Sequence, residues 1–539
     1  MTCTLSVSPV EPPSDFGGGA SSTGTPVVLG LGKTTATCID KDGDGYGLGP
    51  GCANGPDADD NDPTVRTASD VLGKYGSIRA FLNHHIQETL NNPNYTARNI
   101  YYLDAMHGKG GKTNDESRPY RSFMDIANRL RSGDVVLFRA GTYRRMKPLT
   151  FGAPGNPIVF MAYPGEVVKV DAESYEAFAL ENVSGLIIDG FTTISTYPRG
   201  GGECVSGGSE YSNPLTTGPP LFHDVIIQNF DCSQAGRGML IENGLLNLVI
   251  QDSVIHDLPY GTASHPIYLG SRGAPSRNVF VRRNLVFNSG ESGNGVQFNG
   301  RVTNLVVDSN IIYNSSGAGI SLLQGVSNSF ITNNLIFNHT NGGIKIMNYR
   351  DGDPYLLAYD QTGNVIENNT IWQGTTDWHD GDEISSSPIY VFHAGGLKAG
   401  NLTNNVFRNN ILVTSFGPDV PAIDFRDANR PDELQTSTFQ NNIVWSTTGT
   451  KIVAANGSRK YDCAQLVAAT TNSSTCLNSD PLFADVSARY YKQPEKFNFM
   501  LRPGSPAIGA GRATGAPKTD LKGDPRPNPP SIGAYEYPK

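Results

Sequence analysis

The sequence is poor in charge and has no long hydrophobic run. Asp, Glu, Lys and Arg make up 17% of its 539 residues, which is low for a helical bundle or a coiled coil. No stretch of about 18 consecutive apolar residues occurs, so no membrane-spanning helix is predicted. The net charge is −9 and the pI is near 5.5, and this acidic balance argues against nucleic acid as a partner.

The N-terminal stretch lacks the apolar residues that a folded core needs. Residues 1–37 are rich in Ser, Thr, Pro and Gly and are predicted to form a flexible tether. Met1 to Ser14 has no apolar core of an export signal, as in a mature chain with an added start Met. Cys3 has two interpretations: a lipid anchor at a cell surface, or a thiol left near a cloning junction.

Cysteine is scarce, but six of the seven cysteines fall into three locally spaced pairs. The pairs with the shortest loops are Cys38/Cys52, Cys204/Cys232 and Cys463/Cys476. Six cysteines allow other pairings as well. Because disulfides persist in oxidising compartments, a secreted or cell-surface protein is predicted.

Residues 38–66 carry Asp at the spacing of a calcium loop. Asp40, Asp42 and Asp44 stand at its first, third and fifth positions, and Gly45 allows the sharp turn. The twelfth position is Gly51 instead of Glu, so a second acidic group is expected to supply the missing oxygens. The predicted Ca²⁺ ligands are Asp40, Asp42, Asp44, Tyr46, Asp57, Asp59, Asp60 and Asp62. The alternative is a solvated acidic linker.

Two helices are predicted in residues 67–134, which we expect to form a helical cap and the start of the main domain. Apolar residues recur at helical spacing in 77–91, and Ser77 provides an N-cap. A shorter helix is predicted over 120–132, with Gly133 ending it.

From about residue 135 the chain repeats short apolar strands around an Asn. The repeated residues are Asn284, Asn310, Asn334, Asn369, Asn410 and Asn442, and their smallest separation is 24 residues. A period of this length is typical of one coil of a solenoid. Asn tolerates the left-handed conformation of a sharp bend, and stacked Asn side chains satisfy one another's amides. The pattern therefore predicts an asparagine ladder in an all-β parallel β-helix over 135–455, closed by a capping segment at 456–539.

A second repeated pattern precedes each Asn and alternates apolar with variable residues, which indicates a strand with one buried face. Its predicted outward residues are Leu240, Tyr268, Gln297, Ser321, Lys345, Tyr390 and Asp424. Solenoid ends must be covered to prevent edge pairing. We expect the helix at 77–91 and residues 456–539 to do this. Self-association through an uncovered end is the alternative.

Residues 99–539 resemble the right-handed parallel β-helix proteins of the pectate-lyase superfamily. The opening Asn99-Ile-Tyr-Tyr-Leu-Asp, the segment Gly133 to Tyr143 and the closing Ile532-Gly-Ala-Tyr-Glu-Tyr carry the resemblance, together with the Asn repeat. The segment 38–66 resembles the Asp-rich calcium repeats of bacterial surface proteins and thrombospondin type 3 repeats. The β-helix resemblance implies a polysaccharide cleft along the outward column.

The favoured function is β-elimination on a uronic-acid polysaccharide. This reaction needs a base for the proton α to the carboxylate and a cation that neutralises the carboxylate. Lys345 is the predicted base, because partial burial lowers the pKa of a lysine. The other predicted catalytic residues are Tyr390, Asp424 and Arg426, and the predicted substrate-binding residues are Tyr268, Gln297, Arg350, His393 and Trp378.

Two alternatives remain open. A glycoside hydrolase needs two carboxyl groups about 5 Å or about 6.5–9.5 Å apart, and Asp424 with an acidic loop residue is the candidate pair. A non-catalytic β-helix that binds glycan or assembles into an extracellular fibre also fits the tether and the calcium segment. Residues 317–323, on the coil before Lys345, hold no acidic residue, so the calcium ligands that some lyases place beside a Lys base are not matched.

Overall fold

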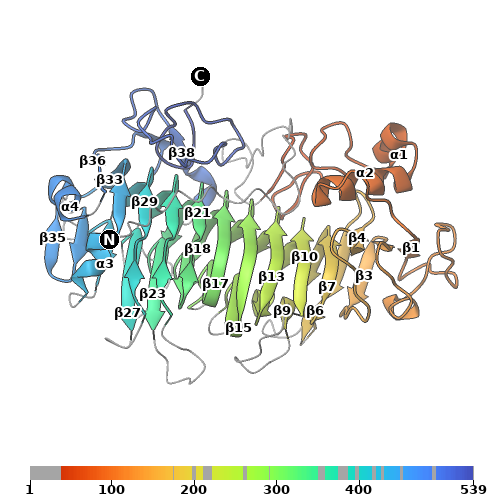
Figure 1. The fold of residues 1–539 in the computed structure, drawn as a ribbon. Coiled ribbons are helices and arrows are strands. Elements are labelled where there is room, and N and C mark those ends of the chain that lie inside the picture. The colour runs from red at the N-terminus through yellow and green to blue at the C-terminus, as the bar shows by residue number, and fades with distance from the viewer. Residues whose placement is uncertain are drawn as a thin grey trace.

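The computed structural model describes residues 38–173, 175–196, 202–209, 221–258, 264–290, 292–349, 359–373, 387–394, 400–415, 420–426, 430–449, 453–470, 472–487 and 493–537. The chain forms a parallel β-helix, in which each coil contributes strands to three faces (Figure 1). Parallel pairing extends from β1 to β36. The predicted tether and Cys3 lie outside the described residues. No helix in the described ranges is long and apolar enough to cross a membrane.

Face A is the side of the solenoid that contains the predicted outward column. Its strands are β6 (Glu176–Glu181), β9 (Glu203–Gly208), β12 (Arg237–Glu242), the first parts of β15 (Ile267–Arg282) and β17 (Val296–Asp308), β19 (Ile320–Leu323), β23 (Ile344–Tyr349), β27 (Ile389–Ala394), β31 (Ile423–Phe425) and β34 (Ala454–Asn456). Their alternating residues point into the solenoid core and outward, as a strand with one buried face requires.

Face B follows face A in each coil. Its strands are β1 (Ile100–Leu103), β2 (Val135–Phe138), β4 (Ile158–Ala162), β7 (Ser184–Asp189), β10 (Phe222–Gln228), β13 (Leu245–Gln251), the second parts of β15 and β17, β20 (Val326–Ser327), β21 (Phe330–Thr332), β25 (Val365–Glu367), β29 (Val406–Arg408) and β32 (Thr438–Gln440). Faces A and B belong to one hydrogen-bonded sheet, because β15 and β17 run from one face into the other.

Face C completes the coil as a separate sheet. Its strands are β3 (Gly141–Arg144), β5 (Val168–Asp171), β8 (Phe191–Ile194), β11 (Asp231–Ser233), β14 (Val254–His256), β16 (Leu285–Phe287), β18 (Ile311–Ser315), β22 (Leu335–His339), β26 (Thr370–Gln373), β30 (Ile411–Thr414), β33 (Asn442–Ser446) and β36 (Cys476–Asn478). Minor strands are β24 (Gln361–Thr362), β28 (Leu402–Thr403), β35 (Arg459–Tyr461), β37 (Phe483–Asp485) and β38 (Asn498–Leu501).

The predicted asparagine ladder is confirmed at the bend between faces B and C. The backbone N–H and side-chain Nδ2 of Asn284 both donate to Oδ1 of Asn310, at 2.9 and 3.0 Å. The same pair of bonds joins each following member as far as Asn442. These side chains are buried, so the ladder satisfies amides that the core would otherwise leave without partners.

The left-handed conformation of this bend falls on the residue before each ladder Asn. The six preceding residues, all with φ between 50° and 55°, are Arg283, Ser309, Asn333, Asn368, Asn409 and Asn441. The ladder residues themselves have no positive φ. The prediction that one Asn performs both tasks is therefore wrong, because two adjacent residues share them.

The N-terminal helices pack along the side of the solenoid. Helix α2 (Ile78–Leu90) begins after the predicted cap Ser77 and follows α1 (Ala68–Tyr75), which the apolar spacing did not reveal. Phe81 and Ile86 of α2 pack on outward residues of face B, including Val135. In Figure 1, α1 and α2 lie above the first coils. The helix therefore covers a side of these coils, where an end cap was expected.

Residues 120–130 pack onto the core at the N-terminal end of the solenoid. The predicted helix over 120–132 is only one 3₁₀ turn, η1 (Phe123–Asp125), although its apolar residues are buried. Phe123 contacts Phe160 of β4 with ring centroids 5.2 Å apart. This short irregular segment thus covers the N-terminal end of the solenoid core, the role predicted for helix α2.

The other helical elements are α3 (Pro431–Thr436), α4 (Cys463–Ala469) and the 3₁₀ turn η4 (Pro494–Lys496). At the C-terminal end of face A, β35 pairs antiparallel with β34, and Leu466 of α4 joins the solenoid core. The three predicted disulfides, Cys38–Cys52, Cys204–Cys232 and Cys463–Cys476, are present.

The last part of the chain folds back over earlier coils (Figure 1). Phe497 packs on Trp372 of face C, and the N–H of Ala534 donates to Thr370 Oγ1 at 2.9 Å. Arg526 donates through Nη2 to Asn333 Oδ1 at 2.7 Å. Residues 493–537 therefore cover the B–C bend and part of face C.

Candidate functional site

The predicted outward column on face A is an uninterrupted file of cross-strand partners. Leu240, Tyr268, Gln297, Ser321, Lys345, Tyr390 and Asp424 pair in this order on consecutive coils. Parallel strands lie about 4.8 Å apart, so the file places distant parts of the sequence side by side. The structure thus brings Lys345, Tyr390 and Asp424 onto three adjacent coils.

Arg426 joins Tyr390 and Asp424 at the C-terminal end of this file. Its Nε lies 3.1 Å from Asp424 Oδ2, and its guanidinium lies 4.6 Å from the centre of the Tyr390 ring. Burial raises the pKa of Asp424, and the hydrogen bond and charge of Arg426 act in the opposite direction. Tyr390 is only 2% exposed, whereas the Arg426 side chain is 40% exposed. Lys345 is half-buried.

The two predicted substrate-binding residues nearest the middle of face A are tied to neighbouring side chains. The Tyr268 hydroxyl accepts a hydrogen bond from Asn299 Nδ2 at 3.0 Å, and Gln297 Oε1 accepts one from Asn294 Nδ2. Tyr268 is 9% exposed and Gln297 is 6% exposed. Both therefore lie in the file but present little surface.

His393 occupies a position different from the predicted one. Its side chain has no exposed surface, and its Nε2 lies 2.6 Å from Glu433 Oε1. A buried imidazole held in this way supports the coil, so a direct contact with substrate does not fit its position. Arg350 and Trp378 lie outside the described residues.

A second set of charged residues on face A was missed from the sequence. Glu176, Glu203 and Arg237 are cross-strand partners on successive coils, and Arg145 pairs with Glu176. Arg237 Nη1 lies 3.7 Å from Glu203 Oε1. Burial raises the pKa of Glu203, Arg237 lowers it and Glu176 raises it further. Extending the outward column three residues upstream on each strand would have revealed this set.

His265 lies between the two charged sets. Its Nδ1 accepts a hydrogen bond from the backbone N–H of Asn294 at 2.9 Å. Burial, together with the positive charges of Arg237 and Lys345, lowers the pKa of His265 to about 4, although the hydrogen bond from Asn294 raises it. Since β12, β15, β17, β19 and β23 pair in this order, the two charged sets lie along a single stretch of face A.

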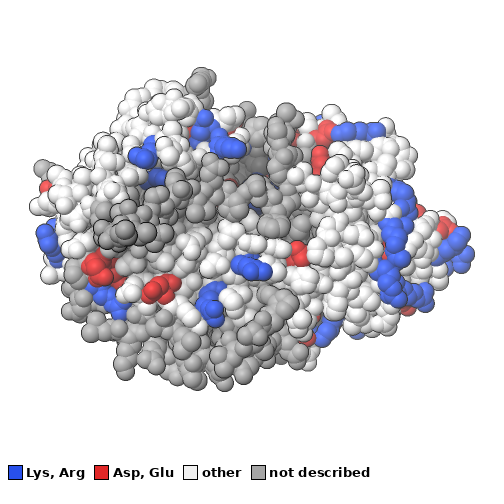
Figure 2. Space-filling view, viewed as in Figure 1, with Lys and Arg blue, Asp and Glu red and all other residues white. Residues whose placement is uncertain are grey.

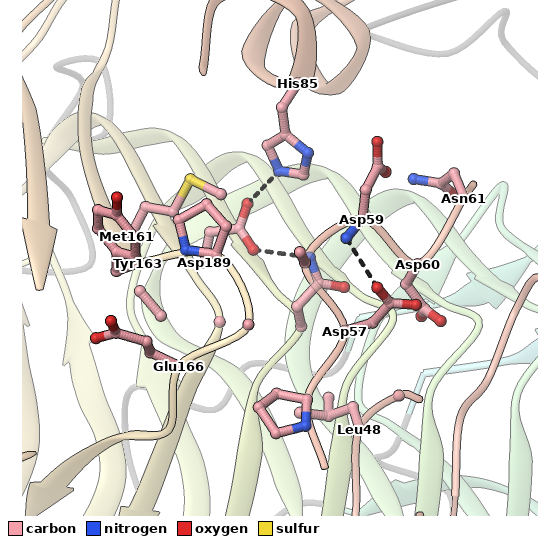
Figure 3. A pocket seen from close by; sticks show the side chains of 18 of the residues that line it. Leu48, Asp57, Asp59, Asp60, Asn61, His85, Met161, Tyr163, Glu166 and Asp189 are labelled. Atoms are coloured by element: carbon pink, nitrogen blue, oxygen red, sulfur yellow. Dashed lines mark hydrogen bonds and ion pairs between the residues drawn. The ribbon is translucent and has the colours of Figure 1, made fainter. Parts of the chain in front are cut away.

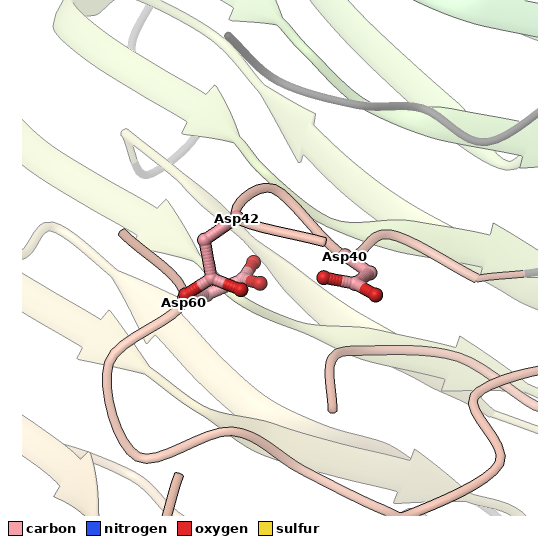
Figure 4. Close-up of side chains that lie close together, drawn as sticks. All are labelled: Asp40, Asp42 and Asp60. Carbon is pink, nitrogen blue, oxygen red and sulfur yellow. The ribbon is translucent and has the colours of Figure 1, made fainter. Parts of the chain in front are cut away.

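The predicted metal ligands form two overlapping groups. The nearest carboxylate oxygens of Asp40, Asp42 and Asp60 lie within 4.8 Å of one another (Figure 4). The same holds for Asp42, Asp44 and Asp57. Asp59 lies beside them and accepts a hydrogen bond from the Tyr75 hydroxyl at 3.1 Å.

Asp62 and Tyr46 stand apart from these groups. Asp62 pairs with Lys74 and accepts a hydrogen bond from Thr64, and the backbone N–H of Tyr46 donates to Asp44 Oδ1. Asp62 belongs to neither of the two carboxylate groups.

The charges of the two groups are compensated only in part by the described residues around them: Arg66 pairs with Asp44 at 2.7 Å, and Lys41 approaches Asp60. Oδ2 of Asp42, Oδ2 of Asp57 and Oδ1 of Asp59 are buried and accept no hydrogen bond there. Burial and neighbouring carboxylates raise the pKa of Asp42 to about 6 and that of Asp57 to about 7, although backbone hydrogen bonds oppose this. Oxygen-rich groups of this kind match the coordination that Ca²⁺ takes in proteins. The residues therefore fit the predicted ion.

The acidic segment is fixed to the solenoid by Lys41. Its Nζ lies 3.5 Å from Asp252 Oδ2 at the B–C bend and 3.7 Å from Asp60 Oδ2. Burial opposes ionisation of Asp252, but Arg283 and Lys41 lower its pKa below the usual range. Asp252 is thus the ionised partner of Lys41. Burial holds the pKa of Asp60 well above its ordinary value, although Lys41 acts to lower it.

A cavity of about 80 Å³ lies between this segment, helix α2 and the bends of the first coils (Figure 3). His85 Nε2 lies 2.7 Å from Asp189 Oδ2 at its wall, and Asn229 donates to Asp189 Oδ1. The cavity is too small for a sugar ring and belongs to the seam that joins the acidic segment to the solenoid.

Charges on the side drawn in Figure 2 are interspersed, and Lys and Arg gather at the end formed by the first coils. The described residues on this side show no extended field of one sign along the coils. Local pairs such as Asp424 with Arg426 therefore determine the electrostatics of face A more than a long-range field does.

Comparison with known proteins supports the fold. The family model for a right handed beta helix region matches residues 177–354. With the parallel register of the strands, this establishes an all-β, right-handed parallel β-helix. No curated protein matches the sequence.

Similar solved structures also contain this fold, at low identity. XylC in complex with xylose is 12% identical, with 81% of this chain and 98% of that chain covered and a TM-score of 0.45. Pectate lyase Pel9A is 13% identical over 83% and 98%, with a TM-score of 0.32. The A-module of the Azotobacter vinelandii mannuronan C-5 epimerase AlgE6 is 15% identical over 64% and 91%, with a TM-score of 0.39. At these values the likeness concerns the fold alone.

Proposed function

We propose that the protein is a secreted or cell-surface β-helix that cleaves a uronic-acid polysaccharide along face A by β-elimination. The observation that carries the proposal is the register of Lys345, Tyr390 and Asp424 on adjacent coils, with Arg426 bound to Asp424 and lying over Tyr390. A base, a proton donor and a guanidinium within one stretch of face A are the groups that this reaction needs.

In the proposed reaction the neutral Lys345 amine takes the proton on the sugar carbon next to the carboxylate. The electron pair of that C–H bond forms a C=C bond to the neighbouring ring carbon, whose bond to the glycosidic oxygen breaks. The Tyr390 hydroxyl gives its proton to the leaving oxygen, and Arg426 neutralises the substrate carboxylate. Proton exchange with water then restores Lys345 and Tyr390.

A Ca²⁺ ion bound by Asp40, Asp42, Asp44, Asp57 and Asp60 has a structural role in this proposal. The ion would neutralise carboxylates that burial destabilises and would hold the acidic segment against the coils. The three disulfides support an oxidising, extracellular location.

Glycoside hydrolysis is the second candidate, and the pair Glu176 and Glu203 favours it. The two carboxyl groups stand on adjacent coils, and burial raises the pKa of Glu203, as a general acid requires. The loop residues predicted as partners of Asp424 lie outside the described residues.

The test is incubation with a panel of polyuronates, followed by ultraviolet absorbance of the unsaturated product and by reducing-end release. We expect both signals from the wild type and neither from Lys345→Ala, while Lys169→Ala, an exposed lysine on face C, retains both. Unchanged turnover by Lys345→Ala would exclude it as the base. Reducing ends without absorbance would favour hydrolysis, and Glu203→Gln should then be inactive. Binding without either signal would leave the non-catalytic alternative.

A further inference from the structure

The outer surface of face C carries a file of rings with one interruption. His256, Phe287, Tyr313, Phe337, Trp372, Val413 and Trp445 are cross-strand partners on consecutive coils. The first four stack with centroids 4.9–5.0 Å apart. Val413 is the one member without a ring.

A cavity of about 320 Å³ lies at this interruption. Its lining includes Trp372, Val413, Trp445, Phe483, Asp480 and Arg502. Its volume lies at the lower end of the range for small-molecule sites, about 300–1,000 Å³. We call it the Val413 cavity.

The C-terminal segment packs its rings on the Trp372 side of the cavity and leaves the Trp445 side without them. Phe497 packs on Trp372 with centroids 4.9 Å apart, and Phe483 packs on Phe499 at 5.4 Å. These rings cover Trp372, which is 2% exposed. Trp445 is half-buried, and no ring of the described residues packs against it. Above the small Val413 side chain, the indole of Trp445 therefore borders the cavity.

The lining has the chemistry of a sugar site. The indole face suits the apolar C–H face of a pyranose ring. Asp480 and Arg502 are exposed at the rim, and their carboxylate and guanidinium can accept from and donate to sugar hydroxyls. An aromatic ligand without hydroxyls would leave these charged groups unused, so the combination favours a carbohydrate.

We propose that the Val413 cavity binds a glycosyl residue, stacked on Trp445 in the place of the missing ring. The site lies on face C and uses none of the residues assigned to chemistry on face A. It would hold a polysaccharide to the protein at a second point. This inference does not depend on whether face A performs elimination, hydrolysis or neither.

The test uses the full chain and a panel of oligogalacturonates, oligomannuronates, xylo-oligosaccharides and cello-oligosaccharides. Tryptophan fluorescence is a direct readout, because two of the three tryptophans line the cavity. We expect at least one oligosaccharide to change the emission and to bind in calorimetry. Trp445→Ala should weaken that binding about tenfold or more, and Trp445→Phe, which keeps an aromatic face, should lose less.

Val413→Phe provides the complementary change, because it supplies the missing ring and fills the cavity. We expect it to abolish binding at this cavity, measured as loss of the change in tryptophan emission, while the melting temperature stays equal or rises. Lys169→Ala, at an exposed position of β5 outside the cavity, should bind as the wild type does. Absence of binding by every oligosaccharide would overturn the proposal, and so would wild-type affinity in Trp445→Ala or in a folded Val413→Phe.

Discussion

The imidazole of His256 stacks on the ring of Phe287, with centroids 5.0 Å apart and the planes within 19° of parallel. The same imidazole lies between two carboxylates, with Nδ1 2.8 Å from Asp257 and Nε2 3.1 Å from Asp231. His256 therefore begins the ring file of face C and also carries an ion-pair network at the edge of the solenoid.

This arrangement predicts a pH dependence of stability. Burial lowers the pKa of His256, but Asp231 and Asp257 outweigh it and raise the pKa to about 9. A raised folded-state pKa adds stability that is fully present below the unfolded value of about 6.5 and is lost as the pH rises through about 9. The difference is on the order of 3 kcal/mol.

Denaturant unfolding between pH 6 and pH 10 checks this prediction. His256→Phe keeps the stacked ring, so the difference in unfolding free energy between wild type and variant should shrink as the pH rises. His107→Phe, at a side chain that is 72% exposed, should show no such trend. A pH-independent difference for His256→Phe would contradict the assignment.

Calcium should stabilise the protein through the acidic segment. At a Ca²⁺ concentration about a hundredfold above Kd, a single site adds about 3 kcal/mol, so the melting temperature should rise with Ca²⁺ and fall on chelation. The double variant Asp42→Asn/Asp57→Asn should lose this response. Asp62→Asn should keep it, because Asp62 pairs with Lys74 outside the two ligand groups. A melting temperature insensitive to chelation would contradict the site.

Interrupting the asparagine ladder should be costly. Asn334→Ala removes the acceptor of two hydrogen bonds from Asn310 and leaves buried amides without partners, so unfolding should become easier by about 3 kcal/mol. Asn478→Ala, at an exposed position of β36, should change stability by less than about 0.5 kcal/mol. Equal stability of the two variants in chemical denaturation would show that the ladder contributes little.

Asp424 should control the affinity of face A for acidic chains. Asp424→Asn removes the carboxylate that pairs with Arg426, so the guanidinium becomes available to a substrate carboxylate. Binding of polyuronates in calorimetry should strengthen on the order of fivefold and become more sensitive to salt. The double variant Asp424→Asn/Arg426→Gln should lose this gain. Weaker binding by Asp424→Asn would instead indicate that Asp424 contacts the ligand directly.

Much of the fold follows from local repetition in the sequence. The Asn column predicted the register because each ladder Asn bonds to its equivalent one coil away, so one spacing defines many contacts. The same register predicts Lys345 beside Tyr390, and the two residues are cross-strand partners. The disulfide pairing was also predictable, because short loops close most readily.

Contacts between segments distant in sequence could not be predicted in this way. Helix α2 has an apolar stripe, but the stripe alone does not determine whether the helix packs on the end or on the side of the coils. His393 directly follows Phe392 at the end of a face A strand, yet Glu433, 40 residues later, holds its side chain inside. The cavity at Val413 depends on where the C-terminal rings settle, which no repeat encodes.

Because the C-terminal segment packs back on earlier coils, those coils cannot be fully covered while the chain is still being synthesised. Thr370 receives its hydrogen bond from Ala534, and Trp372 is covered by Phe497, so coils translated early stay incompletely shielded until more than a hundred further residues have emerged. Until then their outer rings are open to chaperones, to proteases and to other nascent chains. The C-terminal segment thus completes the shielding of the solenoid. A chain truncated before this segment would fold its coils but expose apolar rings that promote aggregation.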